Sequence, residues 1–352
     1  MSRFLDGRLA SLEEYVPGEQ PKDRRYIKLN TNESPYPPPE NVIKALSRHE
    51  AESLRLYSDP ENSVLKQRLA ALYGVTHDNV LVSNGSDEAL NFAFMAYGRD
   101  GVSFPDITYG FYGVFAALYG LKADVIPLNA DFSVNASAFL GKGGLTVIAN
   151  PNAPTGVALP LRVLEGIVAS SKGVVLIDEA YVDFGAESAV GLVGKYDNVI
   201  VVRTFSKSRS MAGARLGYAF ADGAVIRDLE KIRYSTNPYN INRLTQAVGA
   251  AALENQTYFD ENCRRIIKTR EHVTSELKKR GFALTDSRAN FVFAESDRIG
   301  GEELYLKMKE NGVLIRHFGN ERIKNRNRIT IGSEEEMQRF LEITDRILEG
   351  TK

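Results

Sequence analysis

Thr204-Phe205-Ser206-Lys207-Ser208-Arg209-Ser210-Met211-Ala212-Gly213-Ala214-Arg215-Leu216-Gly217 is the stretch that decides the fold. It follows residues 198–203, whose apolar β-branched run predicts a buried strand. A second predicted strand, residues 174–177, ends in Asp178-Glu179-Ala180-Tyr181. Polar side chains therefore follow two strands of one expected sheet. This placement indicates a ligand site, because ligands of open α/β sheets bind beyond the carboxyl ends of the strands.

Lys207, Asp178, Tyr181 and Arg215 together have the chemistry that pyridoxal phosphate requires. The lysine can form a Schiff base with the aldehyde, and the carboxylate can pair with the pyridinium nitrogen. Tyr181 can donate a hydrogen bond to the ring O3′, and an arginine is the best-shaped partner for a phosphate. Taken singly, each residue has a plainer interpretation, such as a loop lysine or a surface arginine. Their order in one chain is what favours the cofactor site.

A phosphate cradle is expected where residues 79–83, a further predicted strand, run into Asn84-Gly85-Ser86-Asp87. Glycine permits the turn, and a serine or an aspartate can cap the helix that follows. The first N–H groups of such a helix are free to bind an anion. We therefore predict phosphate contacts from Gly85, Ser86 and Asp87, with hydroxyls added by Thr204 and Ser206.

Two aromatic or amide side chains are candidates for contact with the cofactor ring. Residues 145–148 predict a strand, and Asn150-Pro151-Asn152-Ala153-Pro154-Thr155-Gly156 follows it. Two prolines and a glycine predict an irregular turn in which a cis peptide can occur. We expect Asn152 to reach the ring from this turn and Tyr109 to stack on the ring.

These segments together resemble the histidinol-phosphate aminotransferase family of fold type I pyridoxal-phosphate enzymes. The resemblance covers nearly the whole chain and extends to residues 28–39, 57–60, 312–316 and 328–332. It implies an α/β fold in which a mostly parallel sheet is covered by helices. It also implies a smaller α/β domain.

The alternation of strands and helices ends near residue 233, which sets the expected domains. We expect a large cofactor-binding domain over 36–235. A small domain would combine an N-terminal arm, 1–35, with residues 236–352. Within 236–352 the sequence predicts helices over 244–255, 262–280 and 334–349, and strands within 282–294 and 328–331.

The resemblance also implies roles for individual residues. Lys207, Asp178 and Tyr181 would be catalytic. Tyr57 would reach the phosphate of the neighbouring subunit's cofactor, which implies a homodimer. The substrate would meet Tyr15, Asn32, Arg316 and Arg328, of which Arg328 would hold the substrate anion. The remaining cofactor contacts would come from Gly85, Ser86, Asp87, Tyr109, Asn152, Thr204, Ser206 and Arg215.

The chain departs from the family pattern at two positions. The residue before Pro-Thr-Gly is usually an asparagine that bonds O3′, and here it is Ala153. Asn152 is the nearest replacement. Ser86 stands where alanine is common, which is a mild change because the backbone N–H is the main phosphate donor.

The implied activity is transamination of L-histidinol phosphate with 2-oxoglutarate, in histidine biosynthesis. The products would be imidazole acetol phosphate and L-glutamate, with ping-pong kinetics. An aromatic amino-acid aminotransferase and a threonine-phosphate decarboxylase are alternatives on the same scaffold, because Arg316 and Arg328 suit the anionic ends of all these substrates. A non-catalytic pyridoxal-phosphate-binding protein is an alternative of a different class, and the intact Lys207 and Asp178 argue against it.

Composition fits a cytoplasmic enzyme with small-molecule substrates. The chain has 352 residues, 25% of them charged, and a net charge of -1, which argues against nucleic acid as a partner. No apolar run reaches the roughly 20 residues that cross a membrane, and the first residues lack the apolar core of a signal peptide. A single cysteine, Cys263, excludes an internal disulfide. The four histidines, His49, His77, His272 and His317, are far apart in the sequence, so no metal site is expected.

Overall fold

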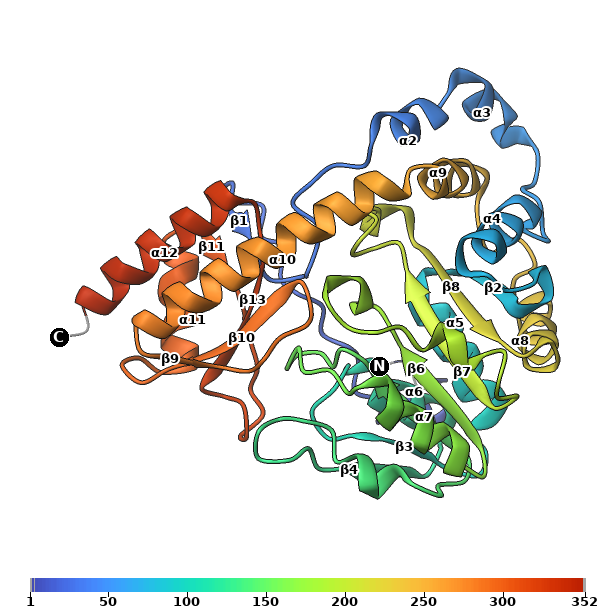
Figure 1. Cartoon of the computed structure of the whole chain (residues 1–352), viewed down its shortest axis with the longest axis horizontal. Helices are drawn as coiled ribbons and strands as arrows, with labels where there is room; N and C mark the ends of the chain where they lie inside the picture. The colour runs from blue at the N-terminus through green and yellow to red at the C-terminus, as the bar shows by residue number, and fades with distance from the viewer. Residues whose placement is uncertain (1, 3, 351–352) are drawn as a thin grey trace.

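The large sheet is mostly parallel (Figure 1), and its central strands are rich in the apolar β-branched residues valine and isoleucine. The structure is a computed structural model that describes residues 2 and 4–350. Across the sheet the strands run in the order β2 (Val80–Asn84), β8 (Leu216–Ala221), β7 (Val199–Thr204), β6 (Val174–Asp178), β5 (Leu145–Ala149), β3 (Val102–Pro105) and β4 (Ala123–Ile126). β8 is antiparallel to both of its neighbours, whereas the pairs from β7 to β4 are parallel.

Helices bury both faces of this sheet. Alternate strand residues point to opposite faces, so Ile177 belongs to one apolar core and Leu176 to the other. Each fully buried side chain of this size contributes about 1.5–3 kcal/mol. One face is covered by α4 (Ser63–Tyr73), α7 (Leu161–Ser170) and α9 (Arg243–Leu253), and the other by α5 (Gly85–Tyr97), α6 (Phe111–Tyr119) and α8 (Gly223–Thr236).

Short helical segments fill the connections of this part of the chain. Several lie at the ends of the large-sheet strands, where the polar residues of interest are found. They are α1 (Gly7–Ala10), α2 (Glu40–Ala45), α3 (Arg48–Glu52), η1 (Ser53–Arg55), η2 (His77–Asn79), η3 (Ala136–Phe139), η4 (Val182–Phe184), η5 (Ala189–Leu192) and η6 (Ala212–Ala214).

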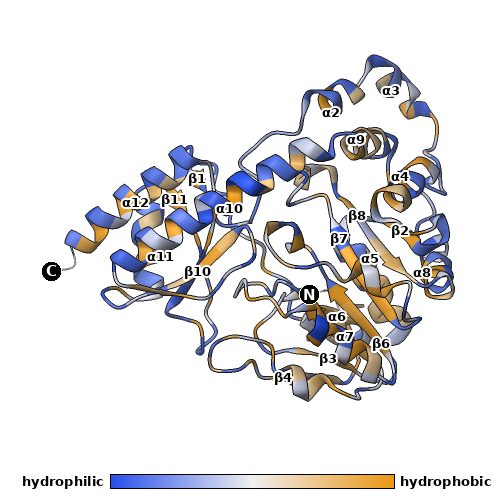
Figure 2. Cartoon of the chain, in the orientation of Figure 1, coloured by the Kyte–Doolittle hydropathy of each residue, from blue (hydrophilic) through white to orange (hydrophobic). Residues whose placement is uncertain are grey.

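A smaller α/β unit has its own apolar core. Its antiparallel sheet has the order β12 (Arg316–His317), β13 (Arg326–Thr330), β10 (Phe291–Ser296) and β9 (Phe282–Leu284). The N-terminal arm joins this unit because β1 (Ile27–Lys28) pairs in parallel with β11 (Val313–Leu314). The helices of the unit are α10 (Gln256–Lys279), α11 (Gly301–Glu310) and α12 (Glu334–Glu349). In Figure 2, α10 and α12 carry separate hydrophilic and hydrophobic faces.

The packing of α9 differs from the domain boundary expected after residue 235. Val248 and Ala252 of α9 join the core that contains Leu65 and Leu69 of α4, so this helix packs on the large sheet. α10 begins at Gln256, six residues before the expected start at 262, and runs from α9 across to the smaller unit (Figure 1). The change of domain therefore falls along α10. The sequence did not indicate this boundary, because the apolar face of a helix does not show which of the two cores the helix packs against.

The described part of the chain has neither a membrane-spanning helix nor a cluster of metal-binding side chains. Among residues 2 and 4–350, no helix is long and apolar enough to cross a membrane. Within the same residues, no group of three or more His, Cys, Asp or Glu side chains is placed to hold a metal ion.

Candidate active site

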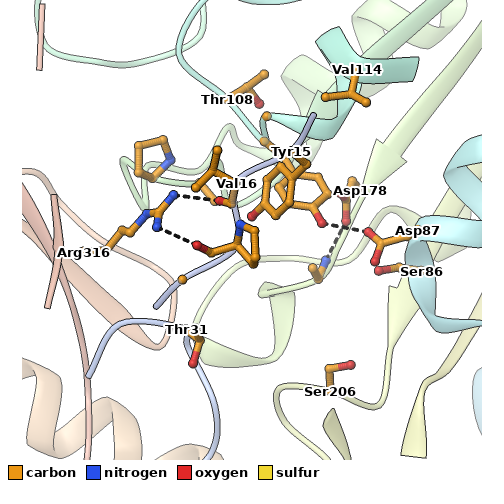
Figure 3. Close-up of a pocket in the computed structure, with 18 of the residues that line it drawn as sticks. Tyr15, Val16, Thr31, Ser86, Asp87, Thr108, Val114, Asp178, Ser206 and Arg316 are labelled. Carbon is orange, nitrogen blue, oxygen red and sulfur yellow. Dashed lines mark hydrogen bonds between the residues drawn. The ribbon is translucent and has the colours of Figure 1, made fainter. Parts of the chain in front are cut away.

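A cavity of about 990 Å³ lies at the carboxyl ends of β2, β5, β6 and β7, where the sequence predicted a ligand site (Figure 3). The N-terminal arm, strands β12 and β13 and the start of α6 supply further walls. The structure brings most of the predicted site residues together here. Those that line the cavity are Tyr15, Ser86, Asp87, Tyr109, Asp178, Tyr181, Thr204, Ser206, Lys207, Arg215, Arg316 and Arg328.

Asp178 is the last residue of β6 and lies in the cavity wall. Its Oδ2 accepts a hydrogen bond from the Tyr112 hydroxyl at 2.8 Å, and its Oδ1 accepts one from the Ala180 N–H at 3.1 Å. Burial raises the pKa of the Asp178 carboxyl to about 6. A ligand cation next to this carboxylate would stabilise its charged form. Sequence reasoning missed Tyr112, because a tyrosine on a helix cannot be told from a core residue.

Lys207 follows β7 on a loop that buried polar contacts hold in place. Its Nζ donates a hydrogen bond to the Thr31 carbonyl at 3.1 Å and lies 5.7 Å from the centre of the Tyr181 ring. The next residue, Ser208, donates to Asp183 at 2.5 Å, and Asp183 also pairs with Arg203 of β7. The loop that carries the lysine is thus tied to the segment that carries Tyr181.

Tyr181 lies beside Lys207 and is fixed on two sides. Its ring packs edge-on against Phe291 with centres 5.1 Å apart. Its hydroxyl accepts a hydrogen bond from Asn32 Nδ2 at 2.9 Å. Asn32 was predicted to contact the substrate, but it is not among the residues that line the cavity. The structure places it behind Tyr181.

The start of α5 forms an anion-binding corner with Arg215. Gly85 has φ 71°, in the left-handed region that favours glycine, and a Cβ there would lie 2.5 Å from Arg215 Nη2. A Cβ on Gly217 would lie 2.4 Å from Ser86 N. Gly85 therefore makes room for the guanidinium, and Gly217 lets β8 approach the start of α5, whose first N–H groups have no partner carbonyl within the helix.

The polar side chains of the same corner are held in place by hydrogen bonds to one another. Thr204 Oγ1 donates to Ser206 Oγ at 2.9 Å. Asp87 accepts hydrogen bonds from the Tyr109 hydroxyl at 2.8 Å and from Arg215 Nη2 at 3.1 Å. Amides, hydroxyls and a guanidinium at one corner match a phosphate. Lys207 and Asp178, both in the same cavity, match an aldehyde and a basic ring nitrogen, so the residues fit pyridoxal phosphate.

Two arginines face each other in the cavity. Arg316 of β12 and Arg328 of β13 are direct partners across antiparallel strands, so their side chains lie on one face of the sheet. Within the described residues, neither guanidinium lies at ion-pair distance from a carboxylate, and the buried Nε of Arg328 has no hydrogen-bond partner. Like charges placed directly opposite each other are destabilising. This pair therefore indicates a site for an anionic part of a ligand.

The N-terminal arm covers this arginine pair. Arg316 donates hydrogen bonds from Nη2 to the Val16 carbonyl at 3.0 Å and from Nη1 to the Pro17 carbonyl at 3.1 Å (Figure 3). The Tyr15 ring stacks on Phe111 with centres 4.3 Å apart. Arg328 donates to the Asn30 carbonyl at 2.9 Å, and burial lowers its pKa.

Asn152 lies outside the cavity lining. It is fully buried, it accepts a hydrogen bond from Thr108 Oγ1 at 2.8 Å, and its Nδ2 donates to the Ile107 carbonyl at 2.9 Å. Ala153 and Pro154 line the cavity instead. The peptide bonds before both prolines of this turn are cis, as the sequence allowed. Contact between Asn152 and a cofactor ring stays a prediction.

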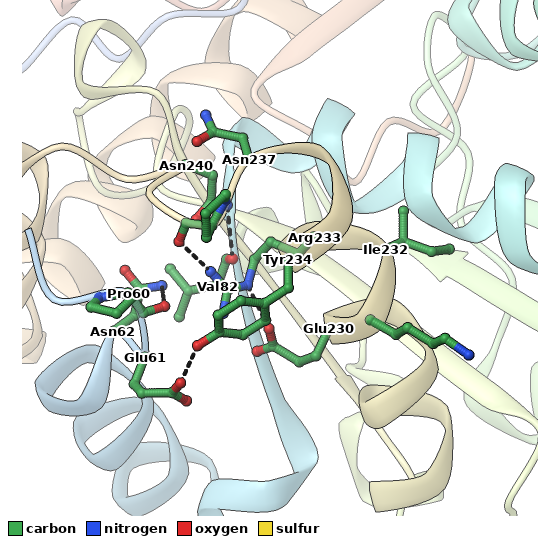
Figure 4. A network of polar contacts seen from close by, with 12 residues as sticks. Pro60, Glu61, Asn62, Val82, Glu230, Ile232, Arg233, Tyr234, Asn237 and Asn240 are labelled. Atoms are coloured by element: carbon green, nitrogen blue, oxygen red, sulfur yellow. Dashed lines mark hydrogen bonds and ion pairs between the residues drawn. The ribbon is translucent and has the colours of Figure 1, made fainter.

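Tyr57 also lies away from this cavity. It is 78% exposed, and its ring stacks on Tyr239 with centres 4.4 Å apart. In the loop that carries Tyr239, Arg233 donates to the Pro238 carbonyl at 2.7 Å, within the network that Figure 4 shows. The same loop is tied to the residue before Gly85, since Asn84 Nδ2 donates to the Asn240 carbonyl at 3.0 Å.

The chain is similar to known proteins over nearly its whole length. Residues 24–343 match the family described as aminotransferase class I and II. The chain is 48% identical over 346 residues to the histidinol-phosphate aminotransferase of Brachyspira hyodysenteriae, with 97% of this chain and 98% of that protein covered. It is 49% identical over 344 residues to the protein of the same name from a Marinomonas species, with 96% and 97% covered. The crystal structure of histidinol-phosphate aminotransferase from Sinorhizobium meliloti in complex with pyridoxal-5'-phosphate has a similar fold, with a TM-score of 0.89 at 24% identity, covering 100% of this chain and 99% of that one.

Proposed function

Because the chain belongs to the histidinol-phosphate aminotransferase family, within the class I and II aminotransferases, we propose that it transaminates L-histidinol phosphate in histidine biosynthesis. Its fold is that of the fold type I enzymes, as the sequence predicted. The observation that carries the proposal is the sharing of one cavity by Lys207, Asp178 and the opposed pair Arg316 and Arg328.

Pyridoxal phosphate is the proposed cofactor, and the cavity offers a partner for each of its polar groups. Ser86, Thr204, Ser206 and Arg215 would hold the phosphate, and Asp178 would face the ring nitrogen. When bound, the cofactor supplies a ring that accepts the electrons released when a bond to the substrate α carbon breaks. The carboxylate of Asp178 would keep the ring nitrogen protonated.

Lys207 is the proposed acid and base. Its Nζ would take the proton from the α carbon of the substrate and later return a proton to the reacting system. Tyr181 would hold a hydrogen bond to the ring oxygen from the position that Asn32 fixes. Tyr15 and the arm around it would keep water out of the cavity, because the arm lies over the arginine pair.

The amino acceptor we propose is 2-oxoglutarate, which is converted to L-glutamate. One pocket must then accept a phosphate monoester and a dicarboxylate in turn. Arg316 and Arg328 can form paired hydrogen bonds with either anion, because guanidinium groups bind carboxylates and phosphates in the same bidentate manner. We expect ping-pong kinetics, with imidazole acetol phosphate released before the acceptor binds.

An absorbance spectrum tests the amino donor directly. The purified protein loaded with pyridoxal phosphate is mixed with L-histidinol phosphate in the absence of any keto acid. We expect the visible band of the lysine-bound cofactor to be replaced by the band of the pyridoxamine form. A response to phenylalanine or tyrosine alone would assign the chain to the aromatic aminotransferases, and carbon dioxide release from threonine phosphate would assign it to the decarboxylases. Absence of any cofactor band would contradict the proposal.

Arg328→Gln is expected to lower kcat/KM for L-histidinol phosphate by roughly 10²-fold, since a hydrogen bond to a charged group contributes about 1.5–3 kcal/mol. The thermal stability of the cofactor-free protein should not fall, because the substitution removes one of two opposed cations. Arg339→Gln is the matched control, since Arg339 lies half-exposed on α12 and pairs with Glu342. Unchanged kcat/KM for both substrates in Arg328→Gln would show that the arginine pair is not the anion site.

We propose a homodimer in which Tyr57 completes the partner's site. The chain segments 43–64 and 234–239, which meet where Tyr57 stacks on Tyr239, expose further large apolar side chains: Ile43, Leu46, Leu54, Leu56, Val64, Tyr234 and Tyr239. A surface of this kind is typical of protein contacts. Tyr57 itself is too exposed in the single chain for a packing role, which supports a contact with a second copy.

Mixing two defective variants tests this contribution. Tyr57→Ala and Lys207→Ala are each expected to be impaired as homodimers. After subunit exchange, a hybrid dimer contains one site with an intact Lys207 and an intact Tyr57 from the other chain. We expect the activity of the mixture at limiting pyridoxal phosphate to exceed the sum of the separate activities. If Tyr57 served its own chain, each hybrid site would lack one residue and no rise would be seen.

Small-molecule substrates and a second copy of the chain are the partners we propose, with a cytoplasmic location. The net charge of -1 argues against nucleic acid as the main partner. The single cysteine, Cys263, is buried and free, as expected for a protein of a reducing compartment.

A further inference from the structure

Thr31 and Asn32 contact both of the proposed catalytic side chains, although they belong to the N-terminal arm. The Thr31 carbonyl accepts the hydrogen bond of Lys207 Nζ at 3.1 Å. Asn32 Nδ2 donates to the Tyr181 hydroxyl at 2.9 Å. Two adjacent residues after β1 therefore meet the lysine and the tyrosine from one side.

The orientation of the Asn32 amide is fixed by its surroundings. Its Oδ1 accepts a hydrogen bond from Thr330 Oγ1 at 2.9 Å, and its backbone N–H donates a hydrogen bond to Thr330 Oγ1 at 3.0 Å. Its carbonyl accepts from Asn290 Nδ2 at 3.0 Å. The residue is 1% exposed and has φ 58°, a conformation that asparagine tolerates better than most residues. With Oδ1 bonded to the Thr330 hydroxyl, the NH₂ group faces Tyr181.

The direction of this hydrogen bond decides what Tyr181 can do. Since Asn32 donates, the phenol oxygen accepts, and the phenol proton is left for an acceptor in the cavity. A hydroxyl that accepts a hydrogen bond becomes a stronger donor, because bonds in a chain polarise one another. Asn32 thus prepares Tyr181 to donate to an oxygen of a bound ligand.

The hydrogen bond between Asn32 and Tyr181 matters more in this chain because position 153 is an alanine. A methyl group occupies the position before Pro-Thr-Gly and cannot donate a hydrogen bond, while the neighbouring Asn152 amide is bonded to Thr108, Thr155 and Ile107. Tyr181 therefore has no asparagine at position 153 to share the ring oxygen with.

We propose that Asn32 is a positioning residue for the cofactor, which acts through Tyr181 to stabilise negative charge on the ring oxygen. The inference rests on the proposed cofactor and not on the identity of the substrate. Asn32 would compensate in part for the amide that Ala153 lacks. It would also link the ring to β13, since Thr330 lies two residues after Arg328 on that strand.

The test measures the proton affinity of the bound chromophore. The protein is loaded with pyridoxal phosphate without substrate, and the visible band is titrated with pH. Stabilised charge on the ring oxygen favours the deprotonated chromophore. Asn32→Ala should therefore raise the apparent pKa of the band, by roughly three- to tenfold in proton affinity, the effect of losing one hydrogen bond. Tyr181→Phe should raise it further.

A double-mutant cycle separates this role from a general structural one. If Asn32 acts through Tyr181, Asn32→Ala should cause no further shift in the Tyr181→Phe background. Asn327→Ala is the matched control, because Asn327 is a buried asparagine of β13 that bonds the Gly301 carbonyl. It should leave the pKa of the band unchanged.

The other titratable groups near Tyr181 remain in every variant. Those that interact electrostatically with it or lie at its ring are Lys207, Arg328, Tyr15, Tyr109 and Tyr112. Asp178 lies three residues before Tyr181 in the same cavity wall. A shift seen in Asn32→Ala and absent in Asn327→Ala therefore reports the lost hydrogen bond.

Asn32→Asp is a second variant of nearly the same shape, for use where the alanine variant does not fold. A carboxylate still accepts from Thr330, but it must also accept from Tyr181, which reverses the hydrogen bond. We expect an upward pKa shift larger than that of Asn32→Ala. A normal band with no shift in these variants, or an equal shift in the Tyr181→Phe background, would overturn the inference. A wild-type protein without any band would overturn the proposed cofactor as well.

Discussion

Lys207→Ala is expected to lower kcat by at least about 10³-fold, because a single side chain both bonds to the cofactor and moves the proton. The visible band of lysine-bound cofactor should disappear with it, leaving the spectrum of unbonded pyridoxal phosphate. The fold should survive, since within the described residues the Lys207 side chain makes a single hydrogen bond, to the Thr31 carbonyl. Steady-state kinetics and absorbance spectra measure both effects.

Lys195→Ala controls for the loss of any lysine, since Lys195 is largely exposed and pairs with Glu165. It should keep both the band and the turnover. Retained turnover in Lys207→Ala, with the thermal unfolding curve unchanged, would show that Lys207 is not the catalytic lysine of this cavity.

Asp178→Asn is expected to lower kcat by roughly 10²- to 10³-fold, as for other losses of a preorganised charge at a reacting centre. A neutral amide cannot hold the proton on the ring nitrogen, so the ring accepts electrons less readily. Tyr112 can still donate to the amide oxygen, whereas the NH₂ group cannot accept from the Ala180 N–H. Single-turnover kinetics with L-histidinol phosphate measure the loss at the chemical step.

The same substitution should stabilise the cofactor-free protein at alkaline pH. Burial raises the pKa of Asp178 from 3.8 to about 6, so the folded protein holds this proton more tightly than the unfolded chain. The stability contributed by Asp178 is therefore full below its unfolded pKa and is lost as pH rises through about 6. Asp178→Asn removes this loss, and we expect a gain on the order of 1 kcal/mol at pH 8, where each pKa unit corresponds to about 1.4 kcal/mol.

Denaturant unfolding of the cofactor-free protein at pH 8 and pH 5 measures this dependence. The gain should shrink as the pH falls, because the wild-type carboxyl is then protonated. Asp228→Asn is the matched control, since Asp228 also accepts a hydrogen bond from a tyrosine, Tyr97, but is exposed. A gain of equal size at both pH values would show that the charge of Asp178 is not its cause.

The site residues at the strand ends were predictable because one short stretch of sequence indicates both the strand and the polar residue that follows it. Runs of β-branched residues mark β6 and β7, and the polar residues that follow them must then lie at one edge of the sheet. Asp178 and Lys207 could be placed in this way without any knowledge of long-range contacts.

The remaining parts of the site depend on contacts between distant segments. Asn32 and Tyr181 are 149 residues apart, and Arg316 meets Val16 across 300 residues. No local pattern encodes such distances. Asn152 illustrates the same limit, because its place beside Ala153 in sequence did not reveal that its amide is bonded to Ile107 and Thr108 of a distant segment.

The contact between the arm and Arg316 has a consequence for what enters the cavity. The Arg316 guanidinium donates hydrogen bonds to two uncharged carbonyls, those of Val16 and Pro17. A ligand group that binds Arg316 must therefore replace these carbonyls as the acceptor. A carboxylate or phosphate adds charge attraction to these hydrogen bonds and can accept hydrogen bonds from two N–H groups of the guanidinium at once. A phosphate or a carboxylate gains from this exchange, whereas an alcohol or a neutral amide does not. The arm carbonyls thereby compete with incoming molecules for Arg316, and a negatively charged molecule displaces them more readily than a neutral one.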